Sequence, residues 1–375
     1  MVSSERQSSA DVPFGSNEMR LSLRQWLVAL AILAAVACSL PACWKWIEPL
    51  EVTRDYRIPY SLSDDYWTYQ RYCEEIGRTD KTLVLGDSVV WGQYVSSEQT
   101  LSHYLNEAAN EDRFANLGVN GMRPAALAGL VEYYGRPLAG RDVILHCNLL
   151  WMSSPRQDLQ ETKQFTFDHP RLVPQFFPRI PCYHENVSAR IGIVVGRQVP
   201  LFGWADHLRI AYFQSKDLRH WTLKHPYADP AAAVTLELPS PDEPQDRPPR
   251  AIPWTEKEEE LRPSYAKRLN LDTSLQWSSL RRTVEILRSR GNRVFVLVGP
   301  LNEHMLKGEA NATYQQQKRD VRAWLEAEGI PHYIPETLPS RLYADESHPL
   351  AEGYQALAEQ LFRQGSFRAF DLGAR

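Results

Sequence analysis

Short apolar runs alternate along most of the chain with longer segments whose apolar residues recur every three to four positions. The short runs are typical of buried strands, and the longer spacing is typical of amphipathic helices. Strands are predicted at Thr82–Leu85, Phe114–Leu117, Val143–Cys147, Arg293–Val298 and His332–Ile334. Helices are predicted at Leu271–Arg290, at Ala312–Glu328 and from Pro349, taken as a first-turn residue.

The alternation of strands and helices predicts an α/β fold with a parallel, doubly wound central sheet of about five strands. Two stretches, 81–151 and 271–375, carry this pattern, and residues 48–80 precede it as a membrane-proximal segment. The interval 152–270 is far longer than one crossover and is rich in Pro, His and aromatic residues. It is interpreted as an insertion, either a lid or substrate-selecting subdomain or a packing elaboration without chemistry. Within it, Ser240–Pro253 is predicted to be a surface linker.

A separate apolar stretch lies near the N-terminus. Trp26–Trp44 contains no charged residue, and its 19 positions would span about 28 Å as a helix, close to the thickness of a bilayer's hydrocarbon core. Residues 26–47 are therefore predicted to be a transmembrane anchor. The short tail 1–25 is placed in the cytoplasm and the rest of the chain on the extracytoplasmic, periplasmic side. A cleaved signal peptide and a lipoprotein signal ending at Cys43 are the alternatives.

Composition narrows the range of other partners. The 375 residues include 42 Lys and Arg against 46 Asp and Glu, a net charge of −4 that argues against nucleic acid as a partner. The five cysteines have no metal-binding spacing, so a zinc site is not predicted. Cys73 and Cys182 could form a disulfide in an oxidising compartment, and free thiols are the alternative.

Candidate chemistry begins where the first predicted strand ends. That strand leads directly into Gly86-Asp87-Ser88, and a turn into a helix is predicted to follow. A serine in this place presents its hydroxyl above the sheet, beside the backbone N–H groups at the start of the helix. Ser88 is therefore a candidate nucleophile, although turns and helix caps use the same residue types.

A base for Ser88 is found near the C-terminus. Asp345 and His348 lie on the loop between the last predicted strand and the last predicted helix, at the same edge of the sheet as Ser88. Their spacing lets the Asp345 carboxylate accept the Nδ1–H of His348, which leaves Nε2 to take the serine proton. The alternative is structural: His348 opens the last helix and Asp345 caps it.

Two further residues are candidates for stabilising an oxyanion. Gly121 follows the second predicted strand and can bring its N–H close to a substrate, because it has no side chain. Asn148 ends the third predicted strand and can donate from its side-chain amide. Together with the Ser88 N–H, these groups would form an oxyanion hole of three donors. Gly118 is an alternative to Gly121.

Taken in order, Gly86-Asp87-Ser88, Gly121, Asn148 and Asp345-x-x-His348 resemble the four sequence blocks of the SGNH (GDSL-like) hydrolase superfamily. The resemblance covers about residues 80–150 and 290–365. It implies a flavodoxin-like α/β/α fold, Ser88 as nucleophile, His348 as base and Asp345 as its orienting acid. It also implies oxyanion donors at Ser88, Gly121 and Asn148. The third block departs from the family pattern Gly-x-Asn-Asp, since here it reads His-Cys-Asn-Leu.

The resemblance implies a serine esterase that works through an acyl-serine and needs no metal or organic cofactor. With the predicted anchor, we expect a membrane-bound enzyme whose substrate is an acylated, in particular acetylated, carbohydrate or a lipid-like ester. An O-acyltransferase that modifies envelope or exported polysaccharide is the first alternative, because water and a sugar hydroxyl compete for the same acyl-enzyme. A binding protein that keeps the scaffold without catalysis is the second.

Overall fold

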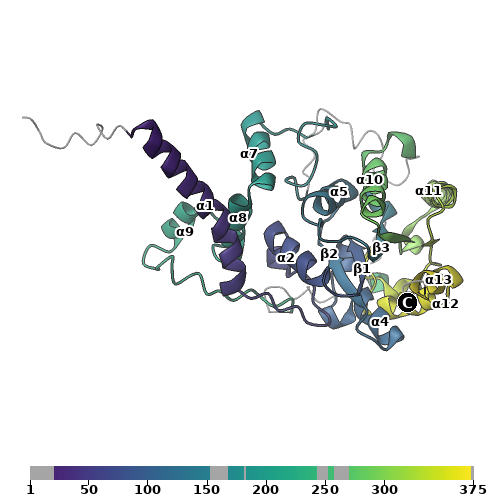
Figure 1. The fold of residues 1–375 in the computed structure, drawn as a ribbon. Coiled ribbons are helices and arrows are strands. Elements are labelled where there is room, and N and C mark those ends of the chain that lie inside the picture. The colour runs from purple at the N-terminus through teal and green to yellow at the C-terminus, as the bar shows by residue number, and fades with distance from the viewer. Residues whose placement is uncertain (1–20, 153–167, 181–182, 243–251, 257–269, 373–375) are drawn as a thin grey trace, which may run out of the picture.

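A central parallel sheet organises the computed structural model, which describes residues 21–152, 168–180, 183–242, 252–256 and 270–372 (Figure 1). The strands are β1 (Thr82–Gly86), β2 (Phe114–Gly118), β3 (Asp142–Cys147), β4 (Arg293–Val298) and β5 (His332–Tyr333). All neighbouring strands are parallel, and their order is β2-β1-β3-β4-β5. This is the order of flavodoxin-like sheets, so the predicted fold class is confirmed. Each strand lies within one residue of its predicted bounds.

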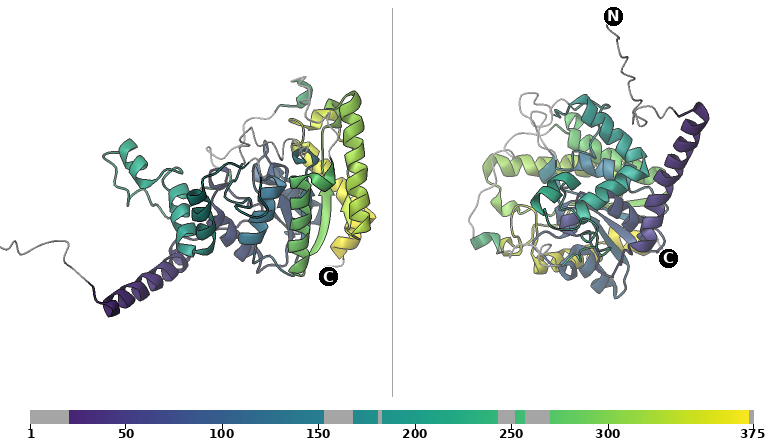
Figure 2. Two further views of the ribbon diagram at one scale, coloured as in Figure 1. Left: turned by 90° about the horizontal axis from the view of Figure 1, so that it is seen from above. Right: turned by 90° about the vertical axis from the view of Figure 1, so that its left-hand side faces the viewer.

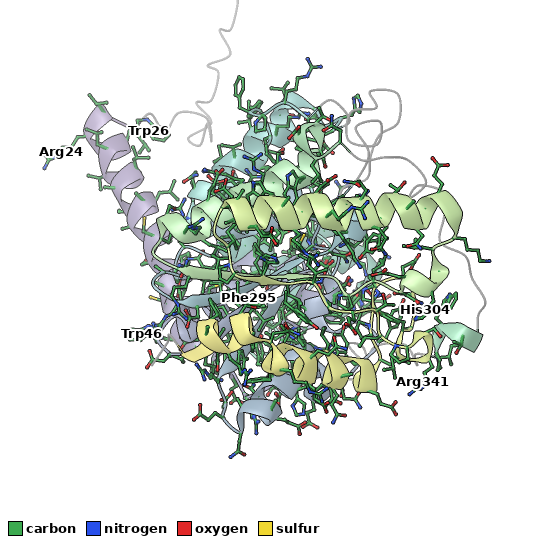
Figure 3. All side chains as sticks on the ribbon, turned by 90° about the vertical axis from the view of Figure 1, so that its right-hand side faces the viewer. Arg24, Trp26, Trp46, Phe295, His304 and Arg341 are labelled. Carbon is green, nitrogen blue, oxygen red and sulfur yellow. The ribbon has the colours of Figure 1, made fainter. Side chains whose placement is uncertain are left out.

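Helices cover both faces of the sheet. One face packs against α2 (Tyr66–Ile76), α5 (Pro124–Tyr133), α10 (Leu275–Ser289) and α11 (Gly308–Ala327). The other face packs against α4 (Leu101–Ala109), α12 (Ala351–Arg363) and α13 (Gly365–Leu372). Figure 3 shows this layering, with the light-green α11 and the yellow α12 and α13 on opposite sides of the strand that carries Phe295.

Burial on both faces explains why the strands read as apolar runs. Val84, Ile144 and Phe295 face the α4–α12 side, whereas the alternate positions Leu83 and Leu145 face the α5–α10 side. Since both sets are buried, almost every strand position is apolar rather than every second one. This feature made the strands recognisable in the sequence.

The described residues contain further helices outside these two layers. The other helices are α1 (Leu23–Ile47), α3 (Ser88–Trp91), α7 (Val187–Gln198), α8 (Pro200–Ala211) and α9 (Leu218–Lys224). Short 3-10 helices are η1 (Tyr60–Leu62), η2 (Ser97–Gln99), η3 (Leu149–Trp151), η4 (Trp254–Glu256), η6 (Leu271–Thr273), η7 (Glu303–Met305) and η8 (Ser340–Leu342).

The starts of three helices can be compared with the predictions. The helix predicted from Leu271 is interrupted at Ser274, whose hydroxyl accepts the Trp277 N–H and caps α10. The last helix follows Pro349, as predicted, and begins at Ala351; Pro349 itself lies outside the first turn, because it pairs with Tyr343 in an antiparallel bridge. In contrast, α11 begins four residues earlier than predicted, at Gly308.

The N-terminal apolar stretch forms a single helix, α1, that projects from the rest of the molecule (Figures 1 and 2). Its length and composition are sufficient to cross a membrane. Only Pro41 is buried within it, near the end that meets the α/β core. Figure 3 shows Arg24 and Trp26 at the opposite end of α1, far from that core. The predicted span thus exists as an exposed apolar helix.

The described parts of the interval 152–270 contain α7, α8 and α9, which lie on the side from which α1 projects (Figure 1). Most of the predicted linker Ser240–Pro253 lies outside the described residues. Cys182 lies outside them too. Its proposed partner Cys73 is a free and fully buried thiol, so the disulfide is not formed and the alternative of a free thiol holds for Cys73.

Candidate active site

Ser88 stands at the carboxyl end of β1 and is the first residue of the short helix α3. Asp87 caps that helix, since its carboxylate accepts the Val89 N–H at 3.0 Å. Gly92 ends the turn in the left-handed region, with φ of 88°. Glycine, aspartate and serine are thus the turn residues that the sequence suggested, and they leave the Ser88 hydroxyl at the strand's carboxyl end.

Ser88, His348 and Asp345 lie together and form a continuous relay of hydrogen bonds. The Ser88 Oγ is 2.8 Å from Nε2 of His348. Nδ1 of the same ring is 2.8 Å from each Asp345 carboxylate oxygen. Asp345 also accepts the backbone N–H groups of Ser347 and His348, each at 3.0 Å. The structural alternative, a helix start alone, does not describe this loop, because both ring nitrogens are engaged and α12 begins later.

The loop that carries Asp345 and His348 is fixed at both ends. Tyr343 is fully buried, bridges Pro349 and donates its hydroxyl to the Leu301 carbonyl at 3.0 Å. Across the loop, the Ala344 N–H donates to the His348 carbonyl at 2.9 Å. The imidazole is therefore held in place before any substrate arrives, as a base that must meet a hydroxyl requires.

The electrostatics of the relay favour a charged pair. Burial lowers the pKa of His348, but the hydrogen bond and charge of Asp345 more than offset this and raise the pKa above its usual value of 6.5. Burial likewise raises the pKa of Asp345, and the hydrogen bond and charge of His348 outweigh it, so that the pKa is lowered. Asp345 thus stays ionised and stabilises the imidazolium that would form when His348 takes a proton.

The two glycine candidates for an oxyanion hole differ in whether their N–H group is free to bind a substrate. The Gly118 N–H donates to the side-chain oxygen of Asn116 at 3.0 Å, so it is already used. Within the described part of the chain, the N–H groups of Gly121 and Ser88 have no acceptor. Gly121 has φ of 71°, a conformation that favours glycine. The geometry therefore favours Gly121 over Gly118 as a donor.

Asn148 follows β3 and is oriented by two hydrogen bonds. Its amide nitrogen donates to an Asp87 carboxylate oxygen at 2.8 Å, and its amide oxygen accepts the Leu150 N–H at 3.0 Å. An amide nitrogen carries two hydrogens, so one remains for a bound substrate. Asn148 is nearly fully buried. The unusual third sequence block nevertheless places this amide next to the residue that precedes Ser88.

Asp87 and His146 form a pair that the sequence analysis missed. Nδ1 of His146 is 3.0 Å from an Asp87 oxygen, and Nε2 is 2.9 Å from the Gly299 carbonyl. Trp151 also donates its indole N–H to Asp87. Burial raises the pKa of Asp87, but the charge and hydrogen bond of His146 outweigh burial and lower the pKa to about 2. Asp87 is therefore an ionised hub that orients Asn148.

A signal for this pair was present in the sequence. His146 and Asn148 are two positions apart at the end of β3, so their side chains point to the same face. The close approach at Gly86 supports the same arrangement, because a Cβ there would lie 2.7 Å from the His146 Cβ. In the sequence, His146 stands out only as a departure from the family pattern, although it occupies the space beside the predicted nucleophile.

Tyr94, another neighbour of the relay, was also missed. Tyr94 sets its ring edge against His348, with 5.4 Å between ring centres, and has a φ of 75° that is uncommon for a tyrosine. Its pKa is raised to about 12, first by burial and then by the charge of Asp345, so the phenol stays neutral.

The interval 152–270 reaches the site through His169. Its Nε2 donates to the Asn120 carbonyl at 2.7 Å, and its Nδ1 is 2.9 Å from an Asp64 oxygen. A Cβ on Gly121 would lie 3.3 Å from the Asp168 Cβ. This segment therefore packs on the loop that carries Gly121, one of the candidate oxyanion donors. A role as a lid stays a prediction.

The arrangement is suited to proton transfer from a serine and to acyl transfer through that serine. In the described ranges, no group of three or more His, Cys, Asp or Glu side chains is arranged to hold a metal ion. The sequence matches no known protein-family model and no curated protein.

Proposed function

We propose that this chain is a membrane-anchored serine ester hydrolase that cleaves O-acyl esters, in the simplest case O-acetyl esters, through an acyl-enzyme on Ser88. One observation carries the proposal. A buried serine hydroxyl, an imidazole and a carboxylate form a relay in which both links measure 2.8 Å. This constellation activates a serine wherever it occurs, whatever the fold that holds it. The resemblance to SGNH hydrolases points to the same chemistry.

In the first half of the reaction, Nε2 of His348 takes the Ser88 proton while Oγ forms a bond to the ester carbonyl carbon. The carbonyl oxygen becomes an oxyanion, which the N–H groups of Ser88 and Gly121 and the amide of Asn148 are proposed to bind. When the oxyanion collapses, the C–O bond to the alcohol breaks, and the alcohol oxygen takes the proton from Nε2. The acyl group is then left on Ser88.

In the second half, His348 takes a proton from water as the water oxygen attacks the acyl carbon. Collapse of the second tetrahedral intermediate breaks the bond to Ser88 and returns the proton to Oγ. Asp345 stabilises the imidazolium in both halves. If a sugar hydroxyl attacks in place of water, the same steps yield acyl transfer, so the transferase alternative is distinguished by product and not by mechanism.

The anchor adds a location to this chemistry. We propose that α1 crosses the membrane, with residues 1–22 in the cytoplasm and the α/β domain on the extracytoplasmic side. The support is an exposed apolar helix, Leu23–Ile47, that meets the domain only near its carboxyl end. An enzyme so placed would act on acylated polymers or lipid-like esters close to the membrane.

The test uses the full-length protein in detergent and p-nitrophenyl acetate as substrate. We expect Ser88→Ala and His348→Ala each to lower kcat by at least about 10³-fold, because each removes a partner of the relay. Circular dichroism should show unchanged folding. Ser278→Ala, at an exposed serine of α10, is the matched control and should keep full activity.

Wild-type activity in both relay variants would refute the proposal. Adding oligosaccharide acceptors then separates the two products. Free acid supports the hydrolase, whereas an acylated sugar formed at the expense of free acid supports the transferase.

A further inference from the structure

We propose that α7, α8 and α9 form a second contact with the lipid bilayer, beside α1. The apolar side chains that would enter the lipid interface are Val187, Ile191 and Val195 of α7, Phe202 of α8, Leu223 of α9 and Tyr227 just after it; we call this set the lipid-facing surface. The inference rests on the proposal that α1 spans the membrane, and its occupant is the lipid bilayer.

The exposed side of α7 is apolar, whereas a helix of a water-soluble domain normally exposes polar side chains. Val187, Ile191 and Val195 recur every four residues and are 64%, 50% and 42% exposed. Helices of water-soluble domains normally turn such a stripe toward the core. In α7 no side chain is buried among the residues described. An apolar stripe that points outward requires an apolar environment or a partner.

The arginines of α7 point the other way, toward the protein. Arg190 donates to the carbonyls of Gln175 and Tyr183, and its guanidinium lies 4.9 Å from the centre of the Tyr183 ring. Arg197 donates to the carbonyl of Val173 at 2.8 Å and lies 4.3 Å from the centre of the Tyr133 ring. The charged groups thus hold α7 on the domain, and they leave its apolar side outward.

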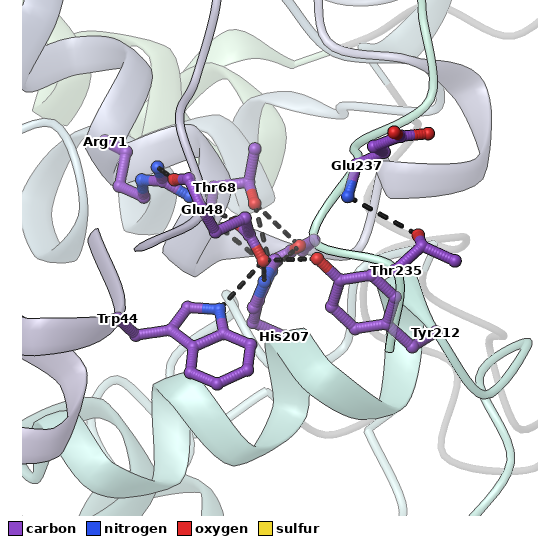
Figure 4. Close-up of polar contacts among 9 residues, drawn as sticks. Trp44, Glu48, Thr68, Arg71, His207, Tyr212, Thr235 and Glu237 are labelled. Atoms are coloured by element: carbon purple, nitrogen blue, oxygen red, sulfur yellow. Dashed lines mark hydrogen bonds and ion pairs between the residues drawn. The ribbon is translucent and has the colours of Figure 1, made fainter. Parts of the chain in front are cut away.

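The position of these helices relative to α1 is fixed by direct contacts. Trp204 of α8 packs edge-on against Trp44 near the end of α1, with 5.5 Å between ring centres. His207 of α8 binds Glu48, the residue that caps α1, at 2.8 Å. Figure 4 shows this cluster between α1 and α8, with Arg71 and Tyr212 also bound to Glu48. These contacts fix the lipid-facing surface on the side of the domain from which α1 projects.

The figures place the lipid-facing surface accordingly. Figure 2 shows α9 and α1 projecting from the same side of the α/β core, with α7 and α8 at its margin. A bilayer that contains the apolar part of α1 would therefore lie against this side. An apolar face continuous with an anchor is the usual form of an interfacial helix contact.

The segment around α9 also carries the charge that such a contact requires. Leu223 and Tyr227 are 70% and 100% exposed, while Trp221 is buried against Phe213 and His225. Lys216, Arg219 and Lys224 lie among these residues. Basic residues beside exposed apolar ones attract anionic headgroups while the apolar ones insert.

The experiment places a nitroxide spin label at single cysteines of the full-length protein in liposomes of phosphatidylcholine and phosphatidylglycerol. In a background where Cys38, Cys43 and Cys182 are serine, the variants are Ile191→Cys, Leu223→Cys, Ile32→Cys and Glu285→Cys. Ile32 lies in α1, and Glu285 lies on α10, outside the proposed surface. Collisions with oxygen report lipid, and collisions with a water-soluble nickel chelate report water.

We expect the oxygen-to-nickel ratio at Ile191→Cys to exceed that at Glu285→Cys several-fold and to approach that at Ile32→Cys. At Leu223→Cys we expect an intermediate ratio that rises with the phosphatidylglycerol content. Thermal melting followed by circular dichroism shows whether each variant is folded.

The outcomes separate this inference from the anchor itself. Ratios equal to the Glu285→Cys control at Ile191→Cys and Leu223→Cys would overturn the inference, while a high ratio at Ile32→Cys would leave the anchor standing. A low ratio at Ile32→Cys would instead refute the anchor. Spin–spin broadening at Ile191→Cys that disappears on dilution with unlabelled protein would show a second copy on the surface, and would also overturn the inference.

Discussion

Among the buried histidines that pair with carboxylates, His348 lies at the candidate active site and His207 at the junction of α1 with the domain. At the site, His348 has Asp345 on Nδ1 and the Ser88 hydroxyl on Nε2. At the junction, His207 has Asp65 on Nδ1 at 2.7 Å and Glu48 on Nε2 at 2.8 Å. The two rings differ mainly in what faces the second nitrogen.

That difference decides what each ring can do. With a carboxylate on both nitrogens, His207 is held as a cation: burial lowers its pKa, but the charges and hydrogen bonds of Asp65 and Glu48 raise it to about 9. An imidazolium held in this way links chain segments, but it cannot act as a base, because both of its ring nitrogens already carry a proton. Nε2 of His348 instead faces a hydroxyl, which can give up its proton. Pairing with a carboxylate on Nδ1 therefore helps His348 to act as a base.

The largest expected effect comes from removing the charge beside the base. Asp345→Asn keeps the shape of the side chain but no longer stabilises the imidazolium or fixes the ring tautomer. We expect kcat for p-nitrophenyl acetate to fall about 10⁴-fold, with little change in the melting temperature. Steady-state kinetics measure the first quantity and circular dichroism the second.

The matched control for Asp345→Asn is Asp112→Asn, a surface carboxylate that binds Lys81. It should leave kcat unchanged. If Asp345→Asn retained more than a tenth of the wild-type kcat, the claim that Asp345 supports His348 as a base would be refuted.

The next effect concerns the junction. His207→Ala removes the buried cation that Asp65 and Glu48 share, although Glu48 keeps its ion pair with Arg71. We expect the free energy of unfolding to fall by about 3–5 kcal/mol, because the Asp65 carboxylate stays buried without that partner. The kcat of the folded protein should stay at the wild-type value, because His207 does not touch Ser88, His348 or Asp345. Urea denaturation of the detergent-solubilised protein measures the loss.

His220→Ala is the control for His207→Ala. His220 also binds an acid, Asp217, but on the exposed surface of α9, where such pairs contribute little. Equal losses of stability in both variants would show that the burial of His207 is not what makes the junction strong.

The relay was predictable because it depends on topology that the apolar pattern reveals. Parallel strands place their carboxyl ends at one edge of the sheet, so Ser88 after β1 and His348 after β5 were expected to lie together. The three-residue spacing of Asp345 and His348 is local, and local spacing can be read directly. The same pattern gave all five strands to within one residue.

The junction was not predictable in this way. Glu48, Asp65 and His207 come from three segments far apart in sequence, and no period or motif connects them. Their meeting depends on how α8 packs on α1 and α2, which only the tertiary structure specifies. His146 is an intermediate case, since its position on β3 was predicted but its pairing with Asp87 depends on the register between β1 and β3.

The smallest effect is a divergence of the two histidines with pH. His348 must be neutral to accept a proton and its pKa is raised above 6.5, so kcat/KM should rise with pH through a value above 6.5, by up to about tenfold per unit below it. The pKa of His207 is about 9 in the folded state, so its stabilisation is complete below 6.5 and is lost as the pH rises through 9. Activity should therefore increase across a range in which the urea midpoint decreases.

The control for this divergence is His207→Ala. In this variant, the decrease in the urea midpoint with pH should become smaller while the activity profile stays the same. An activity profile that shifted together with the midpoint would show that the two histidines are coupled and would remove the distinction between them.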